Sequence, residues 1–224
     1  MTAAAYTVRV NTTNRARRYQ LIIFDFDGTL ADSAHWMIRT FNDIAGQFGL
    51  RRSTEEEIDM LRGRSNAEIV RHMGVPLWKI PRIASEMRKR VAADIDQIKL
   101  FPGVDEMLRV LQEAGVHLAI VSSNSEANVR RVLGATNASR INTYDCEAAM
   151  FGKARKLRAV MRRAGIAPEM TLYVGDETRD IEAAREVHVD AAAVTWGYAK
   201  REILAEFAPT LTFNALSDLH ALAS

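Results

Sequence analysis

Several features that restrict a protein's function are scarce in this chain of 224 residues. It has a single cysteine, Cys146, so no disulfide can form within the chain, which fits a reducing cytoplasm. Its 30 lysines and arginines nearly balance its 28 acidic residues, and this balance argues against a nucleic-acid-binding surface. No apolar run is long enough to cross a membrane, and the first 20 residues lack the apolar centre of a secretory signal. We therefore expect a cytoplasmic protein that binds neither nucleic acid nor membrane.

The length suits one domain, or a core with a small insert. The net charge is +2, but the first 20 residues carry four arginines and no acid. Such a composition favours a weakly ordered extension over a packed element. We therefore assign residues 1–19 to a basic amino-terminal extension.

Short apolar runs alternate with helical patterns along most of the chain. Runs typical of β-strands lie at 20–25, 117–122, 171–175 and 190–195, with a weaker one at 141–146. Between them, apolar residues recur at helical spacing, and each such segment ends at a glycine, in 104–115, 126–134 and 153–165. This alternation predicts an α/β fold, with helices on both faces of a parallel sheet.

Residues 35–98 interrupt the alternation. They contain no convincing strand, and helical patterns run throughout the segment. Ser53 and Glu56 have the spacing of a helix capping box. We expect a helical insert, or cap, over 35–98, which divides a core made of residues 20–34 and 99–224.

The most specific pattern is FDFDGTL at residues 24–30, directly after an apolar run. Two carboxylates, Asp25 and Asp27, stand at the end of a predicted buried strand, where ionised acids are costly without a partner. Side chains two residues apart in a strand share a face, so both could act on one reacting centre. An ordinary polar Asp-Gly turn after a strand is the alternative interpretation.

This segment resembles the first motif of the haloacid dehalogenase (HAD) superfamily, in its phosphatase branch. The resemblance implies a Rossmann-like core with an inserted helical cap, and a Mg²⁺ ion at the site. It implies that Asp25 is the nucleophile, which forms an aspartyl-phosphate, and that Asp27 is the general acid and base. Asp25 would also bind the metal through its carboxylate and Asp27 through its backbone carbonyl. The dehalogenase branch lacks the second aspartate, so Asp27 argues against carbon–halogen cleavage.

The second motif of the family is a hydroxyl at a strand end. Here an apolar run leads into Ser122 and Ser123, and a helix follows. Ser122 matches the catalytic position best, and Ser123 is the neighbouring candidate for substrate binding. Asn124 and Ser125 are interpreted as helix-capping residues.

The third motif is a lysine that neutralises the charge of the phosphate and the nucleophile. Lys153 follows Gly152 at the predicted start of a helix, which is the family arrangement. Many relatives have a proline after this lysine, whereas this chain has Ala154. Lys156 is interpreted as a solvated surface residue.

The fourth motif is LYVGDETRD, at residues 172–180. Asp176 follows the predicted strand, and Asp180 lies four residues later, on the same face of a helix. Together with Asp25 these acids would form a hard oxygen site suited to Mg²⁺. By resemblance Asp176 is a direct ligand, and Asp180 is a ligand or the partner of one. Glu177 could reach the metal too, although favourable charge at a helix N-terminus also explains it.

The substrate is less well specified than the chemistry. A polar loop of the cap contains Arg62 and Arg64, which could pair with a substrate carboxylate such as that of phosphoglycolate. Solvated surface arginines are the alternative. The segment Trp196-Gly197-Tyr198 is expected to form a loop at the rim of the site, and we assign it no chemistry.

These motifs together predict a Mg²⁺-dependent phosphatase that acts on a small phosphorylated metabolite, most like the phosphoglycolate phosphatase group. Two alternatives remain open. A sugar-phosphate mutase of the same fold uses the same four motifs but returns the phosphoryl group to the substrate. A HAD-like fold kept only for binding would not catalyse anything, and the complete set of motif residues argues against it.

Overall fold

The computed structural model describes residues 19–62, 64, 66–147 and 152–223. The predicted extension over 1–19 lies outside these residues except for Tyr19, which is buried and whose hydroxyl donates to Oδ2 of Asp190 at 2.9 Å. None of the helices in the described ranges has the length and apolar character that a membrane crossing needs.

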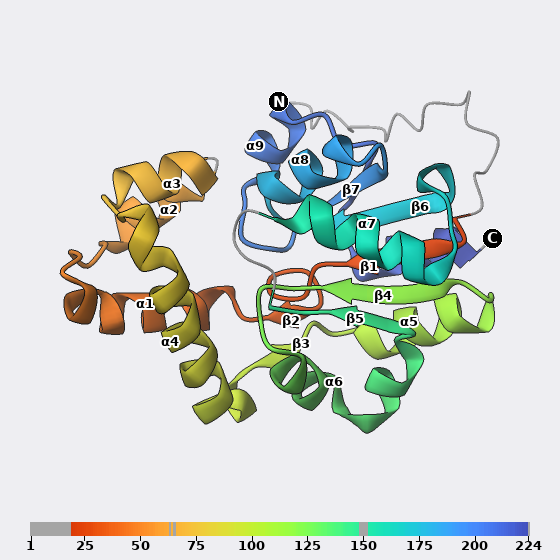
Figure 1. Cartoon of the computed structure of the whole chain (residues 1–224), viewed down its shortest axis with the longest axis horizontal. Coiled ribbons are helices and arrows are strands. Elements are labelled where there is room, and N and C mark those ends of the chain that lie inside the picture. Colours follow the sequence, from red (N-terminus) through yellow and green to blue (C-terminus); the bar gives the residue numbers. More distant parts are fainter. Residues whose placement is uncertain (1–18, 63, 65, 148–151, 224) are drawn as a thin grey trace, which may run out of the picture.

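Six parallel strands form the central sheet, in the order β5-β4-β1-β6-β7-β8 (Figure 1). Their bounds are β1 Leu21–Phe24, β4 His117–Val121, β5 Thr143–Asp145, β6 Thr171–Gly175, β7 Asp190–Val194 and β8 Leu211–Phe213. The predicted α/β fold with a parallel sheet is confirmed. The strand β8 was not predicted.

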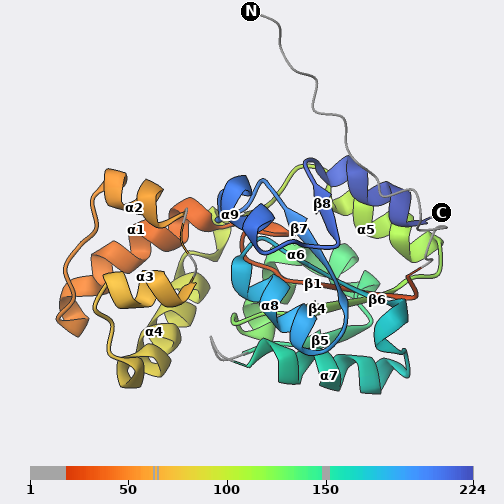
Figure 2. The same cartoon turned by 90° about the horizontal axis from the view of Figure 1, so that it is seen from above.

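Helices cover both faces of this sheet, and Figure 2 shows α5 and α7 on opposite sides of it. One face packs against α5 Val104–Glu113, α6 Glu126–Arg140 and the 3₁₀ segment η5 Leu216–Ala223, and the other against α7 Lys153–Ala164, α8 Thr178–Glu186 and α9 Arg201–Glu206. Alternate side chains of a strand point to opposite faces. Ile22 and Phe24 therefore join one apolar cluster and Leu21 and Ile23 the other, and all four are fully buried. Such a strand is covered on both faces, which explains its continuous apolar sequence.

The segment over residues 34–97 is mainly helical and stands to one side of the sheet (Figure 1, orange to yellow). Its elements are α1 Ala34–Ala45, η1 Gly46–Phe48, α2 Glu55–Leu61, α3 Asn66–His72, η2 Leu77–Lys79, α4 Ile80–Ala93 and η3 Ile95–Gln97. The two chain segments that connect it to the core pair as a short antiparallel ladder, β2 Ala31–Asp32 with β3 Lys99–Leu100. This ladder was not predicted. We call the helical group α1 to α4 the cap.

Two local predictions differ from the structure. The capping box of α2 is formed by Thr54 and Glu57 rather than by Ser53 and Glu56. The backbone N–H and C=O of Ser53 are instead held by the side-chain amide of Asn42, at 2.9 Å each, so the helix begins one residue later.

Helix α6 also continues beyond its predicted end at Gly134, to Arg140. Gly134 has φ 71° and ψ 165°, which are not helical angles, so the glycine bends the chain between two helical pieces instead of ending the helix. A glycine in a helical pattern therefore did not fix the boundary here.

Candidate active site

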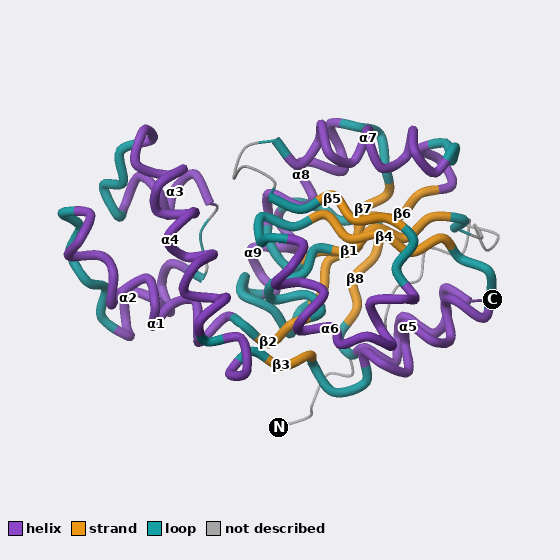
Figure 3. Tube along the Cα trace, turned by 60° about the horizontal axis from the view of Figure 1, so that its bottom comes forward, coloured by secondary structure: helices purple, strands orange, loops and turns teal. Residues whose placement is uncertain are grey.

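Three neighbouring strand ends form the site. β1 lies between β4 and β6, and all three run in the same direction, so their carboxyl ends share one edge of the sheet. Asp25 follows β1, Ser122 follows β4, and Asp176 is the first residue after β6. In Figure 3 the strands lie side by side at the centre of the core, and in Figure 1 the arrows of β4 and β5 point toward the cap. The carboxyl edge of a parallel sheet is the usual place for ligands in such folds.

Lys153, the first residue of α7, is buried between two carboxylates. Its Nζ contacts Oδ2 of Asp25 and lies 2.5 Å from Oδ1 of Asp180, and the three side chains are at most 4% exposed. Burial raises the pKa of Asp25 to about 6, although the charge of Lys153 opposes this rise. Burial would also raise the pKa of Asp180, but the charges of Lys153 and Arg179 outweigh it and lower that pKa. The lysine thus holds a carboxylate on each side.

Asp176 is fully buried and held from two directions. Its Oδ1 accepts a hydrogen bond from the Thr29 hydroxyl at 2.9 Å, and its Oδ2 accepts one from the backbone N–H of Tyr198 at 2.7 Å. Burial raises the pKa of this carboxyl well above its usual range, and the nearby charges of Glu177 and Asp180 raise it further. The backbone hydrogen bond from Tyr198 opposes the rise in this pKa but does not cancel it.

The carboxylates of Asp25, Asp176 and Asp180 fit a metal ion. One ligand oxygen from each lies within 4.8 Å of the others. The hydrogen-bond donors to the Asp176 carboxylate, Thr29 and Tyr198, are neutral, so its charge is buried beside other acids. A set of hard carboxylate oxygens crowded together in this way suits a divalent cation.

Asp27 differs from Asp25 in its partners. Its Oδ1 accepts from the Ser33 hydroxyl at 2.9 Å and its Oδ2 from Nδ2 of Asn124 at 3.3 Å. Burial raises the pKa of Asp27, and these two hydrogen bonds oppose the rise. A carboxyl with a raised pKa and neutral hydrogen-bond donors is suited to carry a proton, whereas Asp25 lies against a cation.

The two serines after β4 have different surroundings. Ser122 is fully buried, and its Oγ accepts from the backbone N–H of Asn124 at 3.0 Å. Ser123 is partly exposed, and its carbonyl accepts from Arg88 of the cap helix α4 at 3.4 Å. Ser125 caps α6 as predicted, since its hydroxyl accepts from the N–H of Asn128 at 3.2 Å.

The cap touches the core through the loop after β7. Arg62 donates from Nε to the carbonyl oxygen of Tyr198 at 2.8 Å and from Nη2 to that of Gly197 at 3.3 Å. Lys200 pairs with Asp59 at 2.7 Å. Arg62 therefore lies at the rim of the site, bonded to the same residue whose N–H holds Asp176. We call residues 197–200 the clasp loop.

Arg64 is the other predicted substrate-binding arginine. Its side chain is 54% exposed and pairs with Glu68 at 3.6 Å. Among the described residues, Arg62 donates hydrogen bonds to the core, whereas the ion pair of Arg64 lies within the cap.

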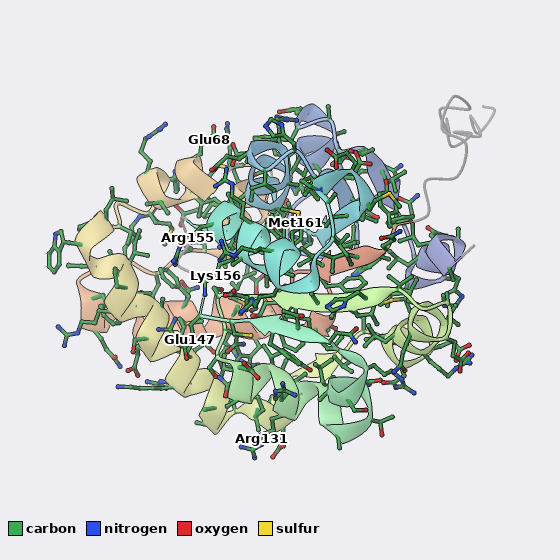
Figure 4. The ribbon with its side chains drawn as sticks, turned by 45° about the vertical axis from the view of Figure 1, so that its right-hand side comes forward. Glu68, Arg131, Glu147, Arg155, Lys156 and Met161 are labelled. Carbon is green, nitrogen blue, oxygen red and sulfur yellow. The ribbon has the colours of Figure 1, made fainter. Side chains whose placement is uncertain are left out.

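The sequence reasoning missed some of these contacts. Asn124 was interpreted only as a helix cap, yet it donates to Asp27, and the clasp loop was assigned no chemistry, yet its backbone holds Asp176. Lys156, labelled on α7 in Figure 4, is 20% exposed and ion-paired with Asp145, so it is not a freely solvated lysine. For Asn124, the available signal was its position, two residues after a motif serine.

Comparison with known proteins identifies the family. A family model described as haloacid dehalogenase-like hydrolase matches residues 22–194. A phosphoglycolate phosphatase of Synechococcus elongatus is 36% identical, over 89% of this chain and 95% of that protein. Phosphoglycolate phosphatase 1 of Pseudomonas aeruginosa is 29% identical, over 89% of this chain and 78% of its own length. The crystal structure of a predicted phosphatase from Clostridium acetobutylicum, 20% identical, superposes with a TM-score of 0.76, over 90% of this chain and 96% of that one.

The fold and the site define an α/β enzyme whose reactive groups stand at the carboxyl edge of a parallel sheet. The extent of the family match and the 36% identity then decide its place: the chain belongs to the haloacid dehalogenase-like hydrolase family. The resemblance inferred from the four motifs, a hydrolase with phosphatases as its relatives, is confirmed.

The backbone packed against Asp176 allows a steric test. A Cβ built on Gly197 would lie 2.2 Å from the Cβ of Asp176, and one built on Gly28 would lie 2.3 Å from Oδ2 of the same residue. We expect Gly197→Ala to displace Asp176 or the clasp loop and to lower kcat/KM at least about tenfold, because small displacements of a positioned group are costly. Steady-state kinetics would measure this loss.

The matched control is Gly46→Ala. Gly46 has φ −60°, and nothing lies within 4 Å of a Cβ built there. This substitution should leave kcat/KM unchanged and the melting temperature equal or higher. Equal activity in the two variants would show that Asp176 is not confined by Gly197.

Proposed function

We propose that this enzyme is a Mg²⁺-dependent phosphatase that hydrolyses a small phosphomonoester through an aspartyl-phosphate on Asp25. One observation carries the proposal: of two carboxylates at the same strand end, one contacts a cation and the other accepts hydrogen bonds from neutral side chains. Asp25 lies against the buried cation of Lys153, whereas Asp27 accepts from the neutral donors Ser33 and Asn124. The first environment suits a nucleophile and the second a proton donor.

In the first step a carboxylate oxygen of Asp25 attacks phosphorus and the ester P–O bond breaks, while Asp27 gives its proton to the departing alkoxide. In the second step Asp27 takes a proton from water, the water oxygen attacks phosphorus, and the bond to Asp25 breaks to release phosphate. Lys153 and Ser122 neutralise and hold the phosphoryl oxygens during both steps. A Mg²⁺ ion held by Asp25, Asp176, Asp180 and the backbone carbonyl of Asp27 would supply positive charge for the phosphoryl group.

The proposed substrate is a small phosphorylated metabolite such as phosphoglycolate. The names of the relatives from Synechococcus elongatus and Pseudomonas aeruginosa support this choice. On the cap side, Ser123, Arg62 and Arg64 are the proposed substrate contacts. The hydrogen bonds from Arg62 of the cap to the clasp loop support its part in closing the cap over the substrate.

The test is a phosphate-release screen over small phosphomonoesters, run with Mg²⁺ and with a chelator. We expect release that depends on Mg²⁺, with phosphoglycolate among the better substrates. Isomerised sugar phosphate without free phosphate would replace the proposal with a mutase. No reaction of either kind across the panel would indicate a protein that only binds.

The raised carboxyl pKa values also predict how stability depends on pH and metal. The pKa of Asp25 is raised from 3.8 to about 6, so its contribution to stability is complete below about pH 4 and is lost as the pH rises through 6. The pKa values of Asp27 and Asp176 are also raised, so these residues too stabilise the fold less as the pH rises. The pKa of Asp180 is lowered, so its contribution to stability is lost as the pH falls. Because a cation binds the ionised carboxylates, Mg²⁺ should raise the melting temperature more at about pH 7.5 than at about pH 5. Thermal melts at the two pH values measure the difference.

The control for this prediction is Asp176→Asn, which removes one proposed ligand charge while keeping the size of the side chain. The variant should show a smaller Mg²⁺-induced rise in melting temperature at the higher pH. A rise that is the same at both pH values in the unaltered protein would contradict a carboxylate metal site.

A further inference from the structure

One cation at the site has no part in the steps above. Arg179 lies in the first turn of α8, between Asp176 and Asp180. Its Nη2 donates to Oε1 of Glu177 at 2.8 Å, and its buried Nε–H has no hydrogen-bond partner among the described residues. The helix dipole makes a first turn unfavourable for a cation, and a buried donor without a partner is costly. The protein alone therefore leaves this guanidinium incompletely satisfied.

The charges around Arg179 are those of the active site. Burial would lower the pKa of its guanidinium, but Glu177, Asp25 and Asp180 raise it. In return, the charge of Arg179 opposes the effect of burial on the pKa of Asp27. The guanidinium thus stands close enough to act on both carboxyls that follow β1.

Exposure places Arg179 farther out than the nucleophile. The side chains of Lys153 and Asp25 are 3% and 4% exposed, whereas those of Arg179 and Glu177 are 18% and 15% exposed. A phosphoryl group must reach Asp25 at the buried end of the site. The remainder of the substrate then extends toward solvent, and Arg179 is the more exposed of the two cations beside Asp25.

We propose that Arg179 binds a carboxylate carried by the leaving group, so that the preferred substrates are phosphomonoesters of short hydroxy acids. This inference rests on the proposed phosphatase function. An arginine has five N–H donors in a planar fork, and Glu177 engages one nitrogen of it. The other N–H groups match the planar geometry of a carboxylate, and Glu177 holds the guanidinium in place for it.

Two substrates of similar size test this role, since 2-phosphoglycolate carries a carboxylate and 2-hydroxyethyl phosphate does not. We expect Arg179→Met to lower kcat/KM for 2-phosphoglycolate about 10- to 100-fold, mainly through KM. For 2-hydroxyethyl phosphate the loss of kcat/KM should be at least severalfold smaller, because the charge of Arg179 acts on Asp25 and Asp27 with either substrate but contacts a carboxylate in only one. Arg179→Lys should recover part of the loss, because it keeps the charge without the fork.

The control is Arg185→Met on the same helix, because Arg185 is exposed and bonds the carbonyl of Phe207, away from the site. This substitution should change kcat/KM for neither substrate. Equal losses for both substrates in Arg179→Met, or no loss for either, would overturn the carboxylate role while leaving the phosphatase function intact. A protein that releases phosphate from no phosphomonoester in the wider screen would refute the proposed function, and this inference with it.

Discussion

Replacing Asp25 with asparagine should lower phosphate release about 10⁴-fold or more, because the amide cannot act as the nucleophile. The side chain keeps its size, and Oδ1 of residue 25 can still accept the backbone N–H of Phe26, a bond of 2.8 Å in the unaltered protein. The fold should therefore persist. Stopped assays for phosphate, together with a thermal melt, would separate a lost nucleophile from a lost fold.

Asp32→Asn is the matched control for this prediction. Asp32 is an exposed aspartate in β2, close to Asp25 along the chain, and the same chemical change there should leave turnover unaltered. Turnover of Asp25→Asn near that of the unaltered enzyme would rule out the covalent mechanism. A phosphorylated protein trapped by rapid acid quench in the unaltered enzyme, and absent in Asp25→Asn, would support it directly.

The second large effect is expected for Lys153→Met. This substitution keeps an unbranched side chain but removes the cation between Asp25 and Asp180, so kcat should fall about 10²- to 10³-fold. Lys153 opposes the rise in the pKa of Asp25, so its loss should raise that pKa further. The limb of the pH–rate profile that requires ionised Asp25 should therefore move to higher pH. Activity measured from about pH 5 to about pH 9 tests both parts.

Lys156→Met provides the comparison for Lys153. Lys156 lies about one turn further along α7, where it pairs with Asp145 and donates to the carbonyl of Cys146 at 3.1 Å. Its loss should leave the pH profile in place, and Asp145 keeps its second ion pair, with Arg163. A shifted profile in Lys156→Met, or an unshifted one in Lys153→Met, would contradict the assigned role of Lys153.

The strands of the sheet could be predicted from the sequence wherever a strand is buried on both faces. The runs that became β1, β4, β6 and β7 are continuous and apolar, because helices cover them on both sides. β8, Leu211–Phe213, was missed because only Phe213 of its three residues is buried, so the sequence there shows no continuous apolar run. The two-residue ladder of β2 and β3 forms only because the two connections to the cap come together in space.

For the site, the strand-end motifs predicted which acids would meet, and in the structure one ligand oxygen each of Asp25, Asp176 and Asp180 lies within 4.8 Å of the others. The hydrogen bonds that orient these carboxylates could not be predicted from the sequence. The donor to Asp176 is a backbone N–H, and every residue except proline has one, so Tyr198 carries no sequence signal for this role. Asn124 and Asp27 are 97 residues apart, and only the pairing of β1 with β4 brings them together.

Two neighbouring backbone amides of the clasp loop can be used to measure movement of the cap. The backbone N–H of Lys200 donates to the carbonyl of Arg62 in the cap, at 2.9 Å, whereas the N–H of its neighbour Ala199 donates to the carbonyl of Asp176 within the core, at 3.4 Å. Hydrogen exchange at Lys200 therefore requires the cap to leave, while exchange at Ala199 requires the core loop to open. The ratio of the two amide exchange rates measures how often the cap separates from the core, in the unaltered enzyme and without any substitution.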